Sequence, residues 1–153
     1  MGQPGQLDAL EPLIGRWRMT PGFLADADEV PHAVTTFDWL AGRRFLIQRW
    51  EVDHPDAPDG LAVIGAGPTT SAYVQHYFDA RGMARDYAMD LADGTWTLDR
   101  FAEHPDFSQR FVGRLSTDGG SIVGRWESSA DLGVTWTLDF DLVYSRLQEP
   151  DRR

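Results

Sequence analysis

Residues Tyr73–Arg100 decide the fold, with the sequence YVQHYFDARGMARDYAMDLADGTWTLDR. Two short turns, Asp79–Gly82 and Asp93-Gly94, divide this stretch into three segments. Apolar and polar residues alternate in each segment, which is typical of β-strands that bury one face. Because each turn is only a few residues long, the three segments are expected to pair as antiparallel hairpins.

The two turns also determine which side chains share a face, because side chains alternate along a strand. A four-residue first turn places His76 across from Arg85, and the second turn places Tyr87 across from Arg100. One face then consists of Val74, His76, Phe78, Met83, Arg85, Tyr87, Met89, Leu91, Trp96, Leu98 and Arg100. The opposite face begins with Tyr73, Gln75 and Tyr77.

The first face is mostly apolar but carries a histidine, two arginines and a tyrosine. Charged groups are buried only when something pairs with them, so these residues predict a polar spot inside an apolar cavity. A bound anion is one partner that could satisfy the arginines. Two alternatives stay open: internal carboxylates pair with them, or the face points outward.

The rest of the chain repeats the strand pattern and adds one short helical segment, residues 7–13. Ten strands are expected, at about 15–20, 33–40, 44–53, 61–67, 72–79, 82–91, 94–102, 108–117, 121–129 and 134–146. Consecutive hairpins with one apolar face favour closure, because closure removes exposed sheet edges. The predicted fold is an all-β, about ten-stranded antiparallel up-and-down barrel over residues 7–147, with frayed ends at 1–6 and 148–153. A two-sheet sandwich is the alternative.

Composition narrows the classes of function. The 153 residues are 42% hydrophobic, which is enough for one domain with a full core. A net charge of -10 argues against nucleic acid or an anionic membrane surface as partner. There is no cysteine, which excludes disulfides and thiol chemistry and fits a reducing compartment. With no secretion signal in the first residues, a cytoplasmic location is expected.

LEPLIGRW (Leu10–Trp17) resembles the opening of calycin-type barrels, with a Gly-x-Trp motif on the first strand. HYFDARG (76–82), YAMDLADGTW (87–96), FSQRFVGRLSTDGGSIVGRWE (107–127) and LDFDLVYSRL (138–147) resemble a bacterial family of lipocalin-like proteins. That family is similar in plan to nitrobindins and fatty-acid-binding proteins. The resemblance implies a barrel that holds a small ligand, but no particular activity.

Nitrobindins bind haem through a histidine on the last strand, shortly before a tyrosine that Tyr144 matches. The corresponding positions are Asp139, Phe140 and Asp141, and no histidine follows His104. The sequence therefore predicts no cofactor and, in particular, no haem of the nitrobindin type. No histidine spacing indicates a metal site either.

Three hypotheses of function follow. The first is a non-catalytic binder of a small amphipathic or acidic molecule, with His76, Arg85, Tyr87 and Arg100 at its polar end. The cavity lining would be Phe78, Tyr87, Met89, Trp96, Leu98, Trp126, Trp136 and Phe140. The second is an isomerase, cyclase or hydrolase that uses His76 as general acid/base and Tyr87 as proton donor. The third is a barrel filled by its own side chains that serves as an interaction module, and a homodimer is left open.

Overall fold

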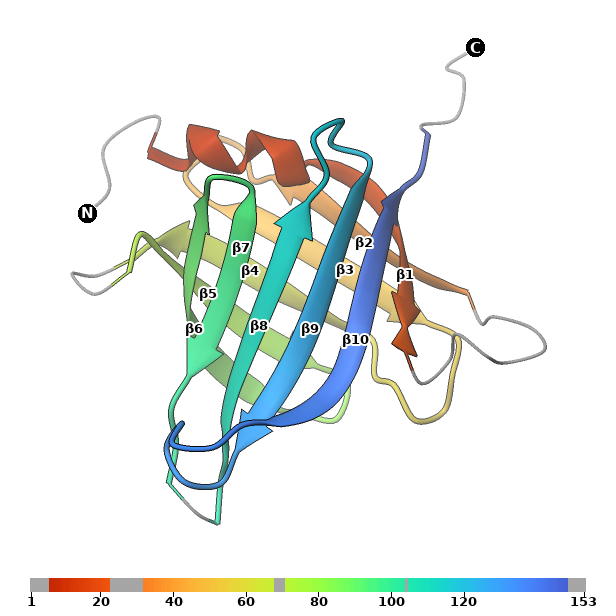
Figure 1. The fold of residues 1–153 in the computed structure, drawn as a ribbon. Coiled ribbons are helices and arrows are strands. Elements are labelled where there is room, and N and C mark those ends of the chain that lie inside the picture. Colours follow the sequence, from red (N-terminus) through yellow and green to blue (C-terminus); the bar gives the residue numbers. More distant parts are fainter. Residues whose placement is uncertain (1–5, 23–31, 68–70, 104, 149–153) are drawn as a thin grey trace.

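The computed structural model describes residues 6–22, 32–67, 71–103 and 105–148. Within these residues ten antiparallel strands form a closed barrel in which each strand pairs with its neighbours along the chain and β1 pairs with β10 (Figure 1). A short helix, η1 (Gln6–Leu13), precedes the barrel. The strands are β1 (Gly15–Pro21), β2 (Ala33–Trp39), β3 (Leu46–Val52), β4 (Gly60–Ala66), β5 (Tyr73–Asp79), β6 (Ala84–Ala92), β7 (Thr95–Arg100), β8 (Ser108–Leu115), β9 (Ser121–Ser129) and β10 (Thr137–Arg146).

This architecture confirms the predicted all-β barrel with its N-terminal helix, and it is compatible with a calycin-like fold. The turn Asp93-Gly94 is also confirmed, since both residues have positive φ, of 53° and 75°, as a two-residue hairpin turn requires. The predicted frayed ends lie outside the described residues, apart from Gln6 and Gln148. None of the helices that the structure describes is long and apolar enough to cross a membrane.

Aromatic rings fill the middle of the barrel. Trp96 lies 4.9 Å from Phe111 between ring centroids, 5.7 Å from Tyr144 and 5.9 Å from Phe37, and all four are buried. Phe111 lies against two glycines, Gly113 on its own strand β8 and Gly124 on β9, where any Cβ atom would meet its ring. The absence of side chains at these two positions is therefore what admits a phenyl ring to the centre.

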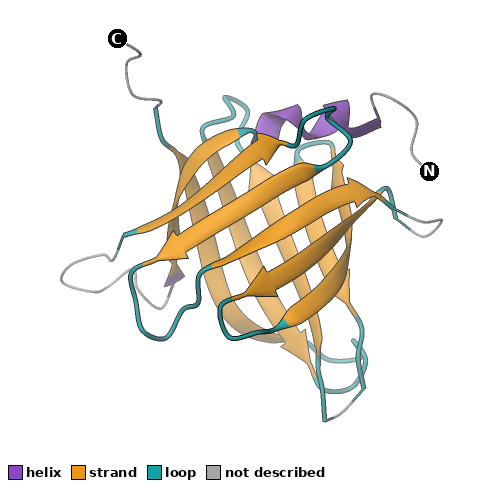
Figure 2. Ribbon diagram, turned by 180° about the vertical axis from the view of Figure 1, so that it is seen from behind, coloured by secondary structure: helices purple, strands orange, loops and turns teal. Residues whose placement is uncertain are grey.

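One end of the barrel is covered by η1, which lies across it in both views (Figures 1 and 2). Leu7, Leu10 and Leu13 turn their side chains into the barrel and are buried there. Trp17 donates from its indole nitrogen to the carbonyl oxygen of Leu13 at 2.9 Å. Arg146 donates to the carbonyl oxygens of Pro12 and Ile14, both at 2.6 Å, so the last strand holds the end of the helix.

The opposite end, which we call the mouth, is where β5 ends and β6 begins. Inward-facing side chains are only partly buried there, in contrast to the buried ring around η1. They include Trp50, Tyr77, Arg85, Gln109, Trp126 and Phe140. Solvent therefore reaches the inside of the barrel from this end.

The predicted register between β5 and β6 is wrong by one residue. His76 pairs with Asp86, and Tyr77 pairs with Arg85. The loop contains three residues, 80–82, and ends in Gly82 with a φ of 87°, which is typical of a three-residue hairpin loop. A slip of one residue moves every side chain of a strand to the other face, so His76 and Phe78 lie outside and Gln75 and Tyr77 lie inside.

The predicted alternation of β10 is wrong at its start. Leu138 pairs with Glu127 and Phe140 pairs with Trp126, so Asp139 is an extra residue that forms a β-bulge. Phe140 faces inward, as predicted, whereas the bulge turns Leu138 and Trp136 to the outside of the barrel. Trp136 and Phe78 are therefore not part of the inner lining.

Candidate functional site

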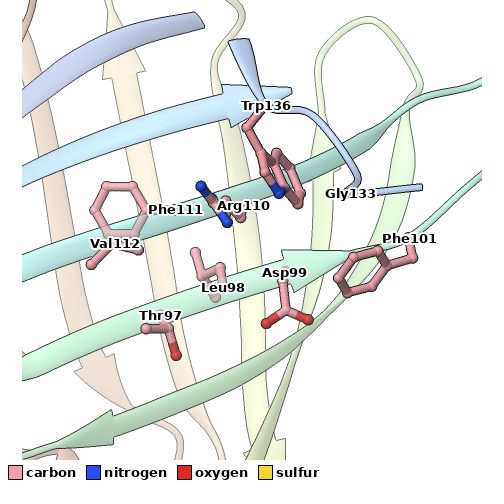
Figure 3. Close-up of a pocket in the computed structure, with 9 residues that line it drawn as sticks. All are labelled: Thr97, Leu98, Asp99, Phe101, Arg110, Phe111, Val112, Gly133 and Trp136. Carbon is pink, nitrogen blue, oxygen red and sulfur yellow. The ribbon is translucent and has the colours of Figure 1, made fainter. Parts of the chain in front are cut away.

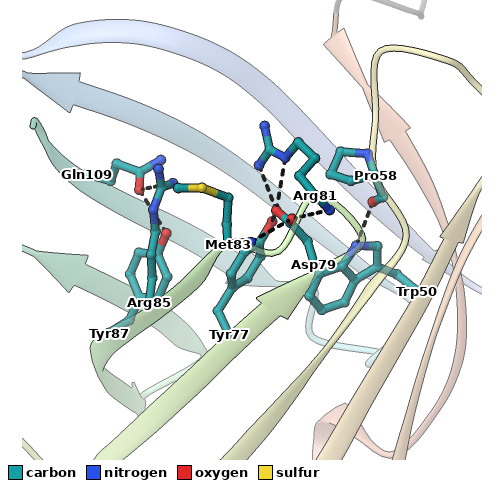
Figure 4. Close-up of polar contacts among 9 residues, drawn as sticks. All are labelled: Trp50, Pro58, Tyr77, Asp79, Arg81, Met83, Arg85, Tyr87 and Gln109. Carbon is teal, nitrogen blue, oxygen red and sulfur yellow. Dashed lines mark hydrogen bonds and ion pairs between the residues drawn. The ribbon is translucent and has the colours of Figure 1, made fainter.

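Three inward side chains meet at the mouth, two from β6 and one from β8 (Figure 4). Gln109 accepts two hydrogen bonds on Oε1, from the Arg85 guanidinium at 3.0 Å and from the Tyr87 hydroxyl at 2.8 Å. The Arg85 guanidinium also lies 5.4 Å from the centroid of the Phe107 ring. We refer to Arg85, Tyr87 and Gln109 as the mouth cluster.

Arg85 forms no ion pair with a described residue, and the acid that acts on it electrostatically, Asp106, is bound by Arg100. Among the described residues, no carboxylate oxygen lies within 4.0 Å of its guanidinium, and its acceptor is the neutral Gln109 amide. Burial raises the pKa of the Tyr87 hydroxyl above its usual value, and the nearby Arg85 offsets only part of this change. Tyr87 is therefore a neutral hydrogen-bond donor near pH 7, beside a fixed positive charge.

Arg100 lies at the same end but is already paired. Its guanidinium donates to Asp106 Oδ2 at 2.6 Å and to the Phe107 carbonyl oxygen at 2.9 Å. Only 15% of the side chain is exposed. The hydrogen bond from Arg100 lowers the pKa of the Asp106 carboxyl. Arg100 thus fixes the loop between β7 and β8, while Arg85 remains available to a ligand.

A second cluster of polar and aromatic side chains lies at the rim of the mouth (Figure 4). The Asp79 carboxylate is fully buried and accepts hydrogen bonds from the Tyr77 hydroxyl and the Arg81 guanidinium, each at 2.6 Å. The Tyr77 ring stacks on Trp50 at 5.3 Å, and the Trp50 indole donates to the Pro58 carbonyl oxygen at 3.0 Å. These contacts connect the β3–β4 and β5–β6 loops and hold the rim in place.

Apolar rings continue from the mouth toward the centre. The Tyr87 ring lies 5.7 Å from Trp126, and Trp126 lies 5.2 Å from Phe111. Phe140 is next to Trp126 on the neighbouring strand. Six of the eight predicted lining residues therefore face the interior: Tyr87, Met89, Trp96, Leu98, Trp126 and Phe140.

His76 is not part of this site. It lies on the outer surface, where its Nδ1 is 2.7 Å from Asp86 Oδ1 and 42% of its side chain is exposed. The structure thus brings together Arg85, Tyr87 and Arg100 of the predicted polar residues and places His76 on the far side of the barrel wall. Catalysis in the cavity by His76 has no support in this geometry.

Two features of the interior were missed by sequence reasoning. Gln109 was not considered, although the alternation that turns Phe111 inward also turns Gln109 inward. A buried polar row crosses the wall as well: Gln75 donates to Gln48 Oε1 at 3.3 Å, and Gln48 donates to Thr35 Oγ1 at 3.2 Å. The register error placed Gln75 outside, which hid this row.

In the part of the chain that the structure describes, no group of three or more His, Cys, Asp or Glu side chains could hold a metal ion. The expected absence of haem stays a prediction. No model of a known protein family matches the chain, and no curated protein matches it either. The function is therefore argued from the site alone.

Proposed function

We propose that the protein binds a short amphipathic anion at the mouth of the barrel, with Arg85 as the counter-charge. The observation that carries the proposal is the inward-facing Arg85 guanidinium, which donates to the neutral Gln109 amide and forms no ion pair with a described carboxylate. A partly buried cation without a counter-ion costs free energy, and a ligand carboxylate or sulfonate would offset that cost with bidentate hydrogen bonds. Tyr87 would donate to the same anion by exchanging its hydrogen bond to Gln109, because its hydroxyl carries only one proton.

The apolar part of the ligand would lie against Trp126 and Phe140. Its length is limited, because the buried Phe111 ring occupies the centre of the barrel. This supports a compact ligand over a long fatty acid. The filled interior is also compatible with the alternative hypothesis, in which the barrel serves as an interaction module. The resemblance to lipocalin-like proteins implies a barrel that holds a small ligand, which is consistent with the proposal.

The test compares Arg85→Met with the matched control Arg125→Met, which removes an exposed arginine from the outside of β9. The probes are anilinonaphthalene sulfonate and its uncharged analogue phenylnaphthylamine, titrated by fluorescence. Loss of a charge-assisted contact of about 1.5–3 kcal/mol should weaken the sulfonate roughly ten- to a hundredfold in Arg85→Met. The uncharged probe should bind equally to all three proteins.

Equal sulfonate affinity in wild type and Arg85→Met, at unchanged melting temperature, would refute the proposal. A parallel loss of both probes in Arg85→Met would also contradict it, because the arginine would then act on packing rather than on the anion. Melting curves of each variant accompany the titrations.

A further inference from the structure

A groove of about 330 Å³ lies on the outside of the barrel (Figure 3), on the opposite face of the wall from the mouth cluster. Its floor is the outer face of β7 and β8, and its wall is the loop that joins β9 to β10. The side chains that matter for its chemistry are Thr97, Asp99, Phe101, Arg110 and Trp136. The bulge at Asp139 creates this groove, because it turns Trp136 out of the barrel.

The floor of the groove and its border carry two acidic side chains, Asp99 and Glu127, but one basic side chain, Arg110. In the backbone register of the sheet, Asp99 lies opposite Arg110 on β8, and Arg110 lies opposite Glu127 on β9. The three side chains therefore form a row on the outer face. Arg110 donates from Nε to Glu127 Oε1 at 2.8 Å. Asp99 makes no hydrogen bond or ion pair with any residue that the structure describes, and burial raises the pKa of its carboxyl. The row thus carries a net charge of about -1 at neutral pH and would accept one cation.

Aromatic rings border the free carboxylate. Phe101 is 60% exposed and meets Trp136 edge to face, with 6.2 Å between the ring centroids. Figure 3 shows the Trp136 indole over Arg110, with Asp99 on the neighbouring strand and Phe101 beyond it. The Arg110 guanidinium already lies 4.2 Å from the centroid of Trp136, so this wall stabilises a cation in the protein itself.

The wall of the groove is held in place by hydrogen bonds. Asp131 accepts from Ser129 Oγ at 2.7 Å and from Thr135 through both its hydroxyl and its backbone nitrogen. Gly133 packs against both rings. A Cβ atom at this position would lie 3.0 Å from the Phe101 ring and 3.1 Å from the Trp136 ring. A preformed site binds with less loss of conformational entropy than one that must be ordered first.

Exposed apolar side chains flank Gly133 in the loop that forms the wall. They are Leu132 and Val134, and Val134 is exposed by 80%. Apolar surface beside an unpaired acid fits a cation with apolar substituents better than a hydrated inorganic ion, whose water shell the rings cannot replace.

We propose that this groove binds a small organic ammonium compound, with Asp99 as the counter-ion and Phe101 and Trp136 against its apolar substituents. The site is separate from the mouth, and the proposal does not depend on the function assigned there. Choline is a suitable probe, and dimethylbutanol, in which carbon replaces the charged nitrogen, is its neutral isostere.

The experiment follows two-dimensional NMR spectra of labelled protein during titration with each compound. Choline should give saturable shifts of the Trp136 indole N–H and of the backbone amides of Asp99 and Gly133. Removal of the charge from either partner should weaken binding about tenfold relative to choline on wild type. We therefore expect this loss both for dimethylbutanol on wild type and for choline on Asp99→Asn. Asp38→Asn, which removes an exposed acid from β2, outside both sites, should leave choline binding unchanged.

Shifts that do not saturate, or that are equal for wild type and Asp99→Asn, would overturn the proposal. Equal binding of the neutral isostere would do so as well. If the same signals move with protein concentration alone and stop moving in Asp99→Asn, the occupant is a basic side chain of a second copy, and the small-ligand proposal fails. Asp99→Asn removes an unpaired acid, so its melting temperature should not fall, and the comparison is made on folded protein.

Discussion

At the scale of single residues, the partners of a side chain decide its use more than its charge does. Arg85 and Arg100 carry the same charge at the same end of the barrel. Arg100 is bound to Asp106 and to a backbone carbonyl, which makes it part of the loop structure. Arg85 contacts a neutral amide and an aromatic ring, which leaves its charge for a ligand. Sequence reasoning grouped both as ligand anchors, because residue type alone does not reveal an acid that lies in a loop.

Asp79 leads to a prediction about pH. The hydrogen bond from Arg81 is the main reason why the pKa of the Asp79 carboxyl lies well below its ordinary value of 3.8. A lowered pKa stabilises the folded protein above the ordinary value, and this stabilisation is lost as the pH falls below it. Asp79→Asn should cost about 1–3 kcal/mol at pH 7. The cost should shrink between about pH 4 and pH 2, where the wild type loses the same contribution.

Urea unfolding of wild type and Asp79→Asn across this pH range measures the effect. Asp86→Asn is the control, since Asp86 lies on the outer surface and contacts the exposed His76. A free-energy difference for Asp79→Asn that stays constant from neutral to acidic pH would show that the carboxylate charge is not what matters.

At the scale of elements, the sequence predicts all ten strands and the helix, because period-two alternation and turn residues are local signals. The predictions fail where one residue changes the parity of a strand. A four-residue turn leaves two residues between the paired strand ends, whereas the β5–β6 loop has three. The bulge at Asp139 likewise adds one residue to β10. Neither residue stands out by its composition. Tyr87, Arg85 and Arg100 were placed correctly because they lie on strands whose parity was correct, and His76 was misplaced because its strand was not.

Arg146 provides a prediction about how η1 is attached. It donates to carbonyl oxygens of Pro12, Ile14 and Gly119 and lies 4.1 Å from the centroid of the Trp17 ring. Arg146→Met should lower the free energy of unfolding by about 1–3 kcal/mol and speed amide exchange in η1. Arg146→Lys keeps the charge but not the fork of donors, so it should recover only part of the loss. Full recovery by lysine would mean that charge alone holds the helix.

At the scale of the whole molecule, the interior is divided into two unequal parts. The half near η1 is packed with rings and leucines, and the half near the mouth carries partly exposed polar and aromatic groups. Phe111 marks the boundary between them, since it touches Trp96 on one side and Trp126 on the other. If a ligand binds at the mouth as proposed, this single side chain would limit the depth to which it enters.

Phe111→Ala tests this division. The substitution should destabilise the protein by about 3–5 kcal/mol, because it opens a cavity in a close-packed centre. It should also raise the affinity for palmitate relative to octanoate, measured by displacement of anilinonaphthalene sulfonate. Phe111→Leu, which removes less volume, serves as a second variant in case the alanine variant does not fold. An unchanged palmitate-to-octanoate ratio in the folded variant would place the ligand elsewhere.

The order of the strands around the barrel has a consequence for how the chain folds. Nine strand pairs join neighbours along the chain, whereas the tenth joins Trp17 to Arg146. The entropy lost on closing a loop grows with the logarithm of its length, so this one pair carries most of the cost of non-local contact. Hairpins can therefore form early and independently, and the rate-limiting event is the meeting of β1 with β10. We also expect the β1–β10 pair to separate first under destabilising conditions, which would convert the barrel into an open sheet.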